Sequence, residues 1–321
     1  MKVLVTGATG FVGSHLCDLL TKNNHQVFAL VRNPTKAKEF GVPGVHLQGD
    51  LSSFEWINDL PKDLDAVVHT AGIVHSFDSK DFYDVNATAT KALIEALASF
   101  DGLKFTLVSS QAAGGPSPKS NPAKEDANAA VSDYGRSKLL AEEYVACAPK
   151  SWSVSVVRPP MVIGPRDPAV LDIFKMVKGR VIVSPGSRPT KKQYSYVCVF
   201  DLVNFLQFLI EKNISGTFYC AYPAAITLQD LVDNIKTRLN KKTVNIVIPP
   251  LLLKGAAKLV QKLGEKNLTQ ARLTSDKMHE LLPSAWVCDS KASINAGFSY
   301  QWDLDKTIDT TINDYKQRGW L

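Results

Sequence analysis

Short apolar runs alternate with helical patterns through the first half of the chain. Most runs are continuous in Val, Leu and Ile, which is typical of strands buried on both faces of a sheet. The helical segments between them, notably over 81–100 and 133–147, connect strands that must then be parallel. The expected strands cover residues 2–6, 26–32, 45–48, 66–70, 105–109 and 153–158. This pattern predicts an α/β fold with a doubly wound parallel sheet.

After Pro165 the elements become shorter and the regular alternation of strand and helix is lost. The pattern predicts helices over 169–178 and 201–211, and strands over 181–183, 196–199 and 217–220. We assign residues 1–165 and 194–220 to the sheet domain, and residues 166–193 and 221–321 to a smaller substrate-binding lobe. Such a lobe is expected to cover the carboxyl edge of the sheet, where folds of this type bind ligands.

The segment 251–263 has apolar residues at helical spacing, with Lys254, Lys258 and Lys262 four residues apart. We interpret it as an amphipathic helix packed on its own domain. Two alternatives are a lid over an apolar ligand and a helix that lies on a membrane surface. Prolines and lysines interrupt this apolar stretch, the longest of the chain, so stable insertion across a membrane is not expected.

Three glycines, Gly7, Gly10 and Gly13, join the first strand to a helical pattern that starts at Ser14. In a dinucleotide site these glycines allow the tight turn, the approach of backbone to pyrophosphate, and close packing of helix on strand. The free N–H groups of the helix N-terminus face the anion. The order of strand, glycines and helix therefore predicts a Rossmann-type cofactor site. Its expected residues are Gly7, Thr9, Gly10, Phe11, Val12 and Gly13.

Tyr134 and Lys138 lie four residues apart on an expected helix, and therefore on one face of it. An ordinary tyrosine pKa of about 10 is too high for proton transfer at neutral pH. A nearby ammonium favours the phenolate and lowers that pKa, and it can also hydrogen-bond ribose hydroxyls. Ser110, at the end of an expected strand, can donate a hydrogen bond to a substrate carbonyl. Together the three residues predict a proton-transfer site.

At this point the chain is identified as resembling the extended short-chain dehydrogenase/reductase family, over nearly all of its length. The resemblance rests on the motifs at residues 6–13, 49–51, 69–72, 85–88, 110, 134–138, 158–165 and 199–202. It implies reversible hydride transfer between a nicotinamide and a carbon that bears a hydroxyl or carbonyl group. In that reaction Tyr134 is the general acid/base, Lys138 its partner and Ser110 the residue that positions the reacting oxygen.

The resemblance also implies further contacts. Asp50 is expected to contact adenine, and Asn86 matches an asparagine carried on a helix of the family. Other expected cofactor residues are Leu51, Thr70, Ala71, Gly72, Lys138 and Pro159. A homodimer through the helices over 81–100 and 133–147 is implied as well.

Cofactor choice depends on the end of the second strand, where NAD enzymes carry an acidic residue for the ribose hydroxyls. Here Arg32 occupies that place, with Lys36 nearby. A guanidinium cannot accept the ribose hydrogen bonds but can bind a 2′-phosphate. We therefore favour NADP over NAD.

The substrate is predicted from two positions at which nucleotide-sugar enzymes of the family carry polar groups. Met161 stands in the segment where such enzymes commonly have an asparagine, and Tyr194 where they often have an arginine. We therefore favour a reductase or dehydrogenase of an apolar or aromatic alcohol or ketone, similar to the 3β-hydroxysteroid dehydrogenase and dihydroflavonol reductase branch. His75 is a further tentative substrate contact. The alternatives are a nucleotide-sugar epimerase or dehydratase with tightly held NAD and a non-enzymatic nucleotide-sensing protein.

Composition and charge bear on the partners, the metal content and the location of the protein. The chain has 321 residues with a net charge of +6, and its basic residues are scattered, so no nucleic-acid partner is expected. Five cysteines, widely spaced and odd in number, indicate buried free thiols in a reducing compartment and no metal site. With the first strand starting at Lys2 and no visible targeting signal, we expect a cytoplasmic protein.

Overall fold

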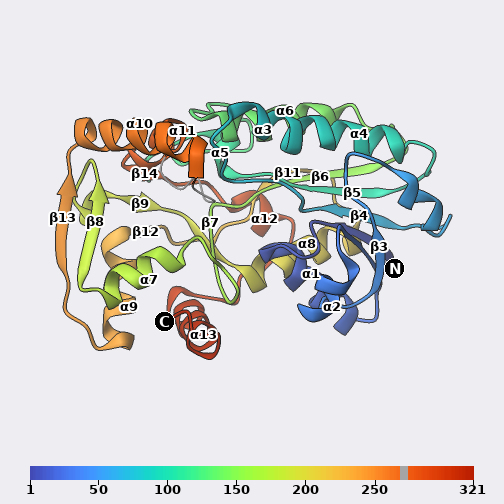
Figure 1. The fold of residues 1–321 in the computed structure, drawn as a ribbon. Coiled ribbons are helices and arrows are strands. Elements are labelled where there is room, and N and C mark those ends of the chain that lie inside the picture. The colour runs from blue at the N-terminus through green and yellow to red at the C-terminus, as the bar shows by residue number, and fades with distance from the viewer. Residues whose placement is uncertain (268–273) are drawn as a thin grey trace.

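A parallel sheet of seven strands forms the centre of the computed structural model, which describes residues 1–267 and 274–321 (Figure 1). Its strands are β1 (Lys2–Thr6), β2 (Gln26–Val31), β3 (Val45–Gln48), β4 (Ala66–His69), β5 (Lys104–Val108), β6 (Ser153–Arg158) and β11 (Gly216–Tyr219). They lie in the order β11-β6-β5-β4-β1-β2-β3. The predicted doubly wound sheet is confirmed, and the order of strands reverses next to β1.

Helices cover both faces of this sheet. The helices α1 (Phe11–Lys22) and α8 (Val199–Lys212) pack on one face, and α4 (Ala89–Ala96) and α6 (Asp133–Ala146) lie on the other (Figure 1). Along β1, Val3 and Val5 join the apolar cluster under α1, whereas Leu4 joins the cluster under α4 and α6. Both sets of strand side chains are buried, which explains the uninterrupted apolar runs in the sequence.

The helix expected over 81–100 is present over 79–96, but a π-helical turn interrupts its α-helical hydrogen bonding. The chain forms α3 (Ser79–Phe82), a π-helical turn over Tyr83–Thr88 and then α4. Asn86 lies in the π-helical turn, and its side-chain amide bonds both the N–H and the carbonyl of Ile73. A π turn holds one extra residue, and such turns are frequent at functional sites.

The C-terminal part consists of small sheets and helices around a separate apolar cluster that includes Phe174, Leu231 and Tyr315. The strands are β7 (Met161–Ile163) with β10 (Tyr196–Cys198), β9 (Gln193–Tyr194) with β12 (Ile226–Thr227) and β14 (Ala285–Trp286), and β8 (Val181–Pro185) with β13 (Val244–Ile248). The longer helices are α7 (Leu171–Lys178), α9 (Leu228–Leu239), α10 (Pro250–Asn267) and α13 (Leu304–Gln317). The short ones are α2 (Pro34–Glu39), α5 (Gln111–Gly114), α11 (Ser275–Leu281) and α12 (Lys291–Asn295).

Some C-terminal residues pack on the central sheet. Phe298, after α12, lies against Phe205 of α8 with ring centres 5.0 Å apart. The division of the chain into the two predicted parts stays a prediction. All five cysteines are free, as expected, but Cys147 is exposed and not buried. Within residues 1–267 and 274–321, no helix combines the length and apolar character needed to cross a membrane.

Candidate active site

The glycine loop between β1 and α1 is shaped by close packing on one side and open space on the other. Gly7 has a φ of +68°, and a Cβ there would lie 2.7 Å from the Ala71 nitrogen. A Cβ on Gly13 would lie 2.2 Å from the Gly7 oxygen. For a Cβ at Gly10 the Gly7 oxygen, at 3.1 Å, is the one atom within 4 Å from the described residues outside its chain neighbours, so the backbone of Gly10 is open to a ligand on that side. The loop therefore fits a pyrophosphate bound by free N–H groups of a helix N-terminus.

The loop that follows β4 lies beside these glycines. The Thr70 hydroxyl donates to the Thr6 carbonyl over 2.7 Å, and the Ala71 nitrogen donates to Thr6 Oγ1 over 3.4 Å. At Gly72 a Cβ would lie 2.8 Å from Asn86 Oδ1 and 3.2 Å from Lys138 Nζ. The absence of a side chain at Gly72 thus allows this loop, the Asn86 amide and the Lys138 ammonium to meet.

Helix α6 carries Tyr134 and Lys138, and Ser132 caps its N-terminus by accepting a hydrogen bond from the Gly135 nitrogen. Lys138 is buried and donates to the Val108 carbonyl at the end of β5 over 3.0 Å. Burial lowers the pKa of Lys138 to about 8. Two residues after Val108, beyond the end of β5, Ser110 caps α5, and its hydroxyl interacts with the phenol of Tyr134.

The pKa of Tyr134 differs from the sequence-based expectation. Burial raises this pKa above the usual value, and the hydrogen bond from Ser110 opposes the rise. Glu280 raises it further, while Lys138 is not among the groups that shift it. The expected lowering by Lys138 is therefore wrong for this structure, because the ammonium is directed at the Val108 carbonyl.

A buried ion pair fixes the carboxyl ends of β5 and β6. The Arg158 guanidinium contacts the Glu142 carboxylate at 2.5 Å, and Glu142 also accepts a hydrogen bond from Ser109. Arg158 donates to the Ala127 carbonyl over 2.6 Å as well. Pro159 follows directly, and its carbonyl accepts a hydrogen bond from the Gln111 nitrogen over 2.9 Å. The backbone on both sides of Ser110 is thus held in place.

The remaining expected cofactor residues lie at the other strand ends. Arg32 is exposed just after β2. Asp50 lies after β3, and hydrogen bonds from Ser52 lower its pKa, with a smaller effect from Arg32. Leu51 packs against the apolar cluster between the sheet and α4. The structure therefore places the expected residues along one edge of the sheet.

The three tentative substrate residues separate into two groups. Met161 in β7 and Tyr194 in β9 pack against the same apolar cluster of the C-terminal part. Burial raises the pKa of Tyr194 to about 12, so its phenol is neutral. His75 is half-buried in the loop after β4, away from that cluster. Met161 and Tyr194 thus share one apolar cluster, to which His75 does not belong.

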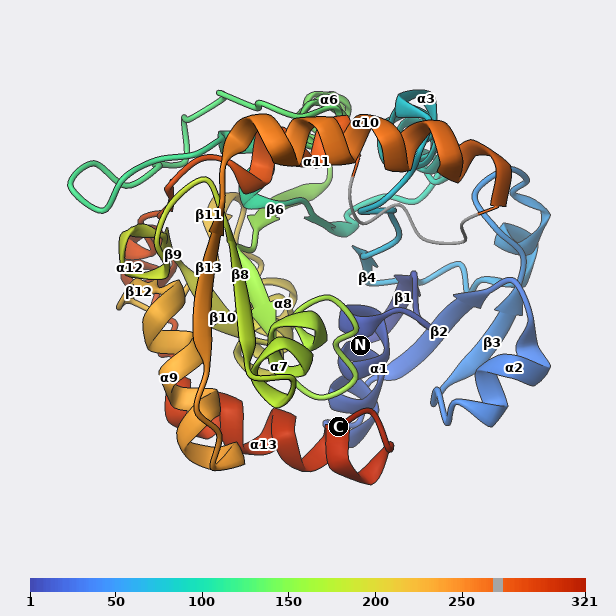
Figure 2. The ribbon, with the colours of Figure 1, turned by 60° about the vertical axis from the view of Figure 1, so that its left-hand side comes forward.

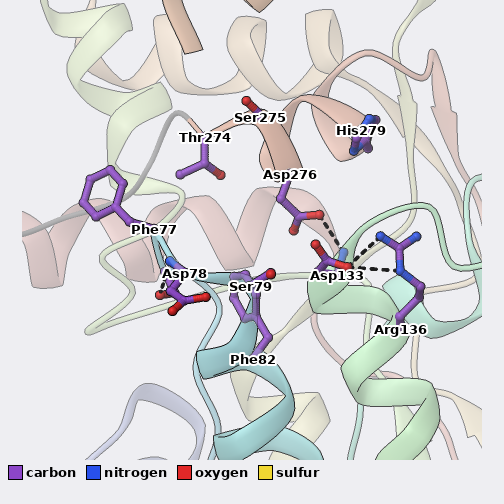
Figure 3. Close-up of a pocket in the computed structure, with 11 residues that line it drawn as sticks. Phe77, Asp78, Ser79, Phe82, Asp133, Arg136, Thr274, Ser275, Asp276 and His279 are labelled. Atoms are coloured by element: carbon purple, nitrogen blue, oxygen red, sulfur yellow. Dashed lines mark hydrogen bonds and ion pairs between the residues drawn. The ribbon is translucent and has the colours of Figure 1, made fainter. Parts of the chain in front are cut away.

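A cavity of about 580 Å³ opens beside the N-terminus of α6 (Figure 3). It lies between the loop before α3, α6 and α11, and Figure 3 shows Asp276 of α11 directed at the first turn of α6. Its lining residues are Ser76, Phe77, Asp78, Ser79, Phe82, Asp133, Arg136, Thr274, Ser275, Asp276 and His279. Phe82 of this cavity also packs edge-on against Tyr134, with ring centres 6.0 Å apart.

Helix α11 contributes contacts to α6 that the sequence did not reveal. Asp276 accepts hydrogen bonds from the backbone nitrogens of Asp133 at 2.6 Å and Tyr134 at 3.4 Å. Lys277 lies over the Tyr134 ring, with Nζ 5.9 Å from its centre, and pairs with Glu280 at 2.5 Å. In the sequence near α11, Thr274 indicates where this helix begins, because its side chain caps the helix, but it does not indicate the contact with α6. Contacts between segments so far apart in the chain leave no sequence pattern.

The fold and site together define a protein that binds a dinucleotide along one edge of a doubly wound sheet, with a buried tyrosine and lysine beside it. A family model described as the NAD dependent epimerase/dehydratase family matches residues 3–220. The chain belongs to this family of extended short-chain dehydrogenases/reductases, as its motifs predicted. It is therefore an enzyme of that type, and the interpretation as a nucleotide-sensing protein without activity loses its support.

Individual relatives differ in the reactions their names describe. A ceramide reductase of Caulobacter vibrioides is 27% identical, and the match covers 99% of this chain and 96% of the relative. An N-acetyl-α-D-glucosaminyl-diphospho-ditrans,octacis-undecaprenol 4-epimerase of Escherichia coli O157:H7 is 26% identical over 97% of this chain and 94% of its own. A solved UDP-glucuronic acid 4-epimerase of Bacillus cereus, in complex with UDP-glucuronic acid and NAD, matches with a TM-score of 0.79. That structure is 20% identical and covers 99% of this chain and all of its own.

Proposed function

We propose that this chain catalyses reversible hydride transfer at a carbon that bears a secondary hydroxyl or a carbonyl group. The observation that carries this proposal is the contact of Tyr134 with Ser110 at the carboxyl end of β5, beside buried Lys138 and the open glycine loop. A nicotinamide cofactor, when bound, supplies or accepts the hydride. The residues of the glycine loop, the loop after β4 and Lys138 would hold it.

The protein side chains move the proton and orient the reacting oxygen. Ser110 would donate a hydrogen bond to that oxygen, and Tyr134 would transfer the proton. Because burial raises the pKa of Tyr134, its phenol is protonated at neutral pH and suited to give a proton to a carbonyl oxygen. In the opposite direction the deprotonated phenol would accept the proton of the substrate hydroxyl, while the Lys138 ammonium would hydrogen-bond the ribose hydroxyls of the bound cofactor.

The relatives support a nucleotide sugar or a related diphosphate-linked sugar as substrate, with 4-epimerisation as the reaction. Two of the proteins described above are 4-epimerases of such sugars, and further relatives are named UDP-glucose 4-epimerases. These comparisons favour this interpretation over a reductase of apolar alcohols and ketones. The B. cereus complex contains NAD, which supports a nicotinamide cofactor but not the preference for NADP.

Two structural observations favour the second candidate, a reductase of an apolar substrate. Met161 and Tyr194 pack against an apolar cluster, and Met161 has no hydrogen-bond donor for a diphosphate. Arg32 is exposed at the end of β2, where it can bind the 2′-phosphate of NADP. The name of the C. vibrioides relative, a ceramide reductase, agrees with such a substrate class.

Cofactor release separates the two candidates. The purified protein is denatured and the supernatant is assayed for NAD and NADP. Stoichiometric bound NAD, together with interconversion of UDP-glucose and UDP-galactose without added cofactor, would support the epimerase. Turnover only with added NADPH and an apolar ketone would support the reductase.

Replacement of Tyr134 tests the shared chemistry of both candidates. We expect Tyr134→Phe to lower kcat by about 10²- to 10⁴-fold, because it removes the general acid/base. Tyr144→Phe is the matched control, since Tyr144 lies on the same helix but its ring packs with Lys91. Unchanged turnover in the Tyr134 variant would exclude the proposed role.

A further inference from the structure

Exposed aliphatic side chains gather on β8, β13 and the first turn of α10. We call this set, Val181, Val244, Ile246, Leu251 and Leu252, the β8–β13 surface. Val244 is 67% exposed, Leu251 81% and Leu252 64%. The strands form one outer edge of the molecule, and α10 leads from the end of β13 toward α6 (Figures 1 and 2). A cluster of this kind on a protein surface marks an interaction site.

The register of the two strands makes this surface continuous. β8 and β13 pair in parallel, with Val181 opposite Val244 and Val183 opposite Ile246. On β8 the alternate residues Ile182 and Ser184 are fully buried, so Val181 and Val183 face outward, as do Val244 and Ile246, which pair with them. Among the described residues this sheet has only these two strands. The exposure of Val181, Val244 and Ile246 shows that this face is open to solvent among the described residues.

Cations predominate in the segments that carry this surface. The stretches 173–200 and 237–264, which contain β8, β13 and most of α10, include no Asp or Glu. The exposed cations beside the aliphatic residues are Lys178, Arg180, Lys242 and Lys254. Nearby acids are engaged elsewhere: Asp233 of α9 pairs with Lys236, and Asp276 of α11 binds α6. The aliphatic face is thus framed by cations.

We propose that the β8–β13 surface docks on the surface of an anionic lipid bilayer. Leu251 and Leu252 would enter the boundary between head groups and acyl chains, and the framing cations would contact anionic head groups. A second copy of this chain fits less well, because a symmetric contact would place the two cationic frames against each other. The proposal is independent of which substrate class the active site takes.

Co-sedimentation with vesicles tests this proposal. The full-length chain should bind vesicles of phosphatidylcholine with phosphatidylglycerol, bind pure phosphatidylcholine much less, and dissociate as salt is raised. The double variant Leu251→Ser/Leu252→Ser should weaken binding by at least about tenfold, because both side chains lose their contact with the acyl region. Phe40→Ser is the matched control, since Phe40 is also exposed but lies at the end of α2, outside this surface.

A second double variant tests the contribution of the cations to vesicle binding and leaves both leucines in place. Lys242→Gln/Lys254→Gln should weaken binding to anionic vesicles by about tenfold, whereas Lys22→Gln/Lys150→Gln should not. Circular dichroism and hydride-transfer activity confirm that each variant is folded. Absence of vesicle binding, or equal binding by the variants and their controls, would overturn the proposal. So would a wild-type dimer in light scattering that the leucine variant converts to a monomer, because the occupant would then be a second copy.

Discussion

Burial of the single side chain of Lys138 lowers the pKa of its ammonium, and this predicts how the activity depends on pH. Because its pKa is lowered to about 8, the ammonium is present below that pH and is lost above it. We expect kcat/KM to fall as pH rises through about 8, since the neutral amine binds the ribose hydroxyls of the cofactor less strongly than the ammonium does. Lys138→Arg should remove this alkaline limb, at reduced activity, because the guanidinium stays charged. A wild-type profile that is flat to higher pH would contradict the prediction.

Arg32 is the residue whose replacement tests cofactor choice. We expect Arg32→Glu to raise KM for NADP by about 10- to 100-fold, because a charge-assisted hydrogen bond to the 2′-phosphate is lost and a like charge is introduced. KM for NAD should stay the same or fall. Lys38→Glu is the control, because it makes the same change of charge at an exposed position of α2. Equal effects of both variants on the two cofactors would argue against a role for Arg32.

At the scale of elements, Lys192 holds α11 in place. Its fully buried ammonium donates to the carbonyls of Leu281, Leu282 and Pro283, where α11 ends, over distances of 2.6 to 3.2 Å. We expect Lys192→Met to destabilise the protein by about 2–4 kcal/mol, because buried carbonyls lose their donor. Amide hydrogen exchange should become faster in α11 and in the first turn of α6. Lys191→Met, at an exposed neighbour, should change neither quantity.

The strands of the central sheet could be predicted closely because their side chains are buried on both faces. The bounds of β1, β3 and β6 agree with the sequence pattern, β2 and β4 end one residue earlier than predicted, and β5 and β11 are each shifted by one residue toward the N-terminus. The π turn before α4 could not be predicted, because it depends on the contact of Asn86 with Ile73. The sequence pattern did not predict β13, whose apolar residues are largely exposed to solvent and do not belong to a buried core.

The candidate site was predictable only in part, because some of its contacts join segments that are far apart in the sequence. Tyr134, Lys138 and Ser110 follow from local motifs and from the rule that parallel strands end at one edge. The docking of Asp276 on α6 joins residues 143 positions apart, and no local pattern encodes such a contact. The direction of the Tyr134 pKa shift also needs three-dimensional knowledge, because it depends on how completely the phenol is buried.

At the scale of the whole molecule, His69 couples stability to pH. It is buried between Thr6 and Thr90, with its ring nitrogens 2.6 and 2.9 Å from their hydroxyls. Thr90 donates its own hydrogen to the Asn86 carbonyl, so it accepts from Nε2, and the neutral ring leaves Nδ1 to accept from Thr6. Burial accordingly lowers the pKa of His69 to about 3. A protonated ring does not fit this network.

This network predicts acid sensitivity. Between the unfolded-state pKa of about 6.5 and the folded-state pKa of about 3, only the unfolded chain binds the proton at His69. The free energy of unfolding should therefore fall with pH below about 6, with a contribution of up to about 1.4 kcal/mol per pH unit from this residue. Urea titrations at several pH values measure the slope. His69→Gln should be less stable at neutral pH but show a shallower slope, and an unchanged slope would assign the effect to other groups.

The contact of α11 with α6 has a consequence for the order in which the protein matures. A ribosome has completed every strand of the central sheet once residue 219 is made, whereas Asp276 and Lys277 come later. A nascent chain can thus assemble its sheet while the amides of Asp133 and Tyr134 still lack their carboxylate acceptor. Catalytic competence should arrive only as the segment after residue 274 leaves the exit tunnel and folds back on the finished sheet.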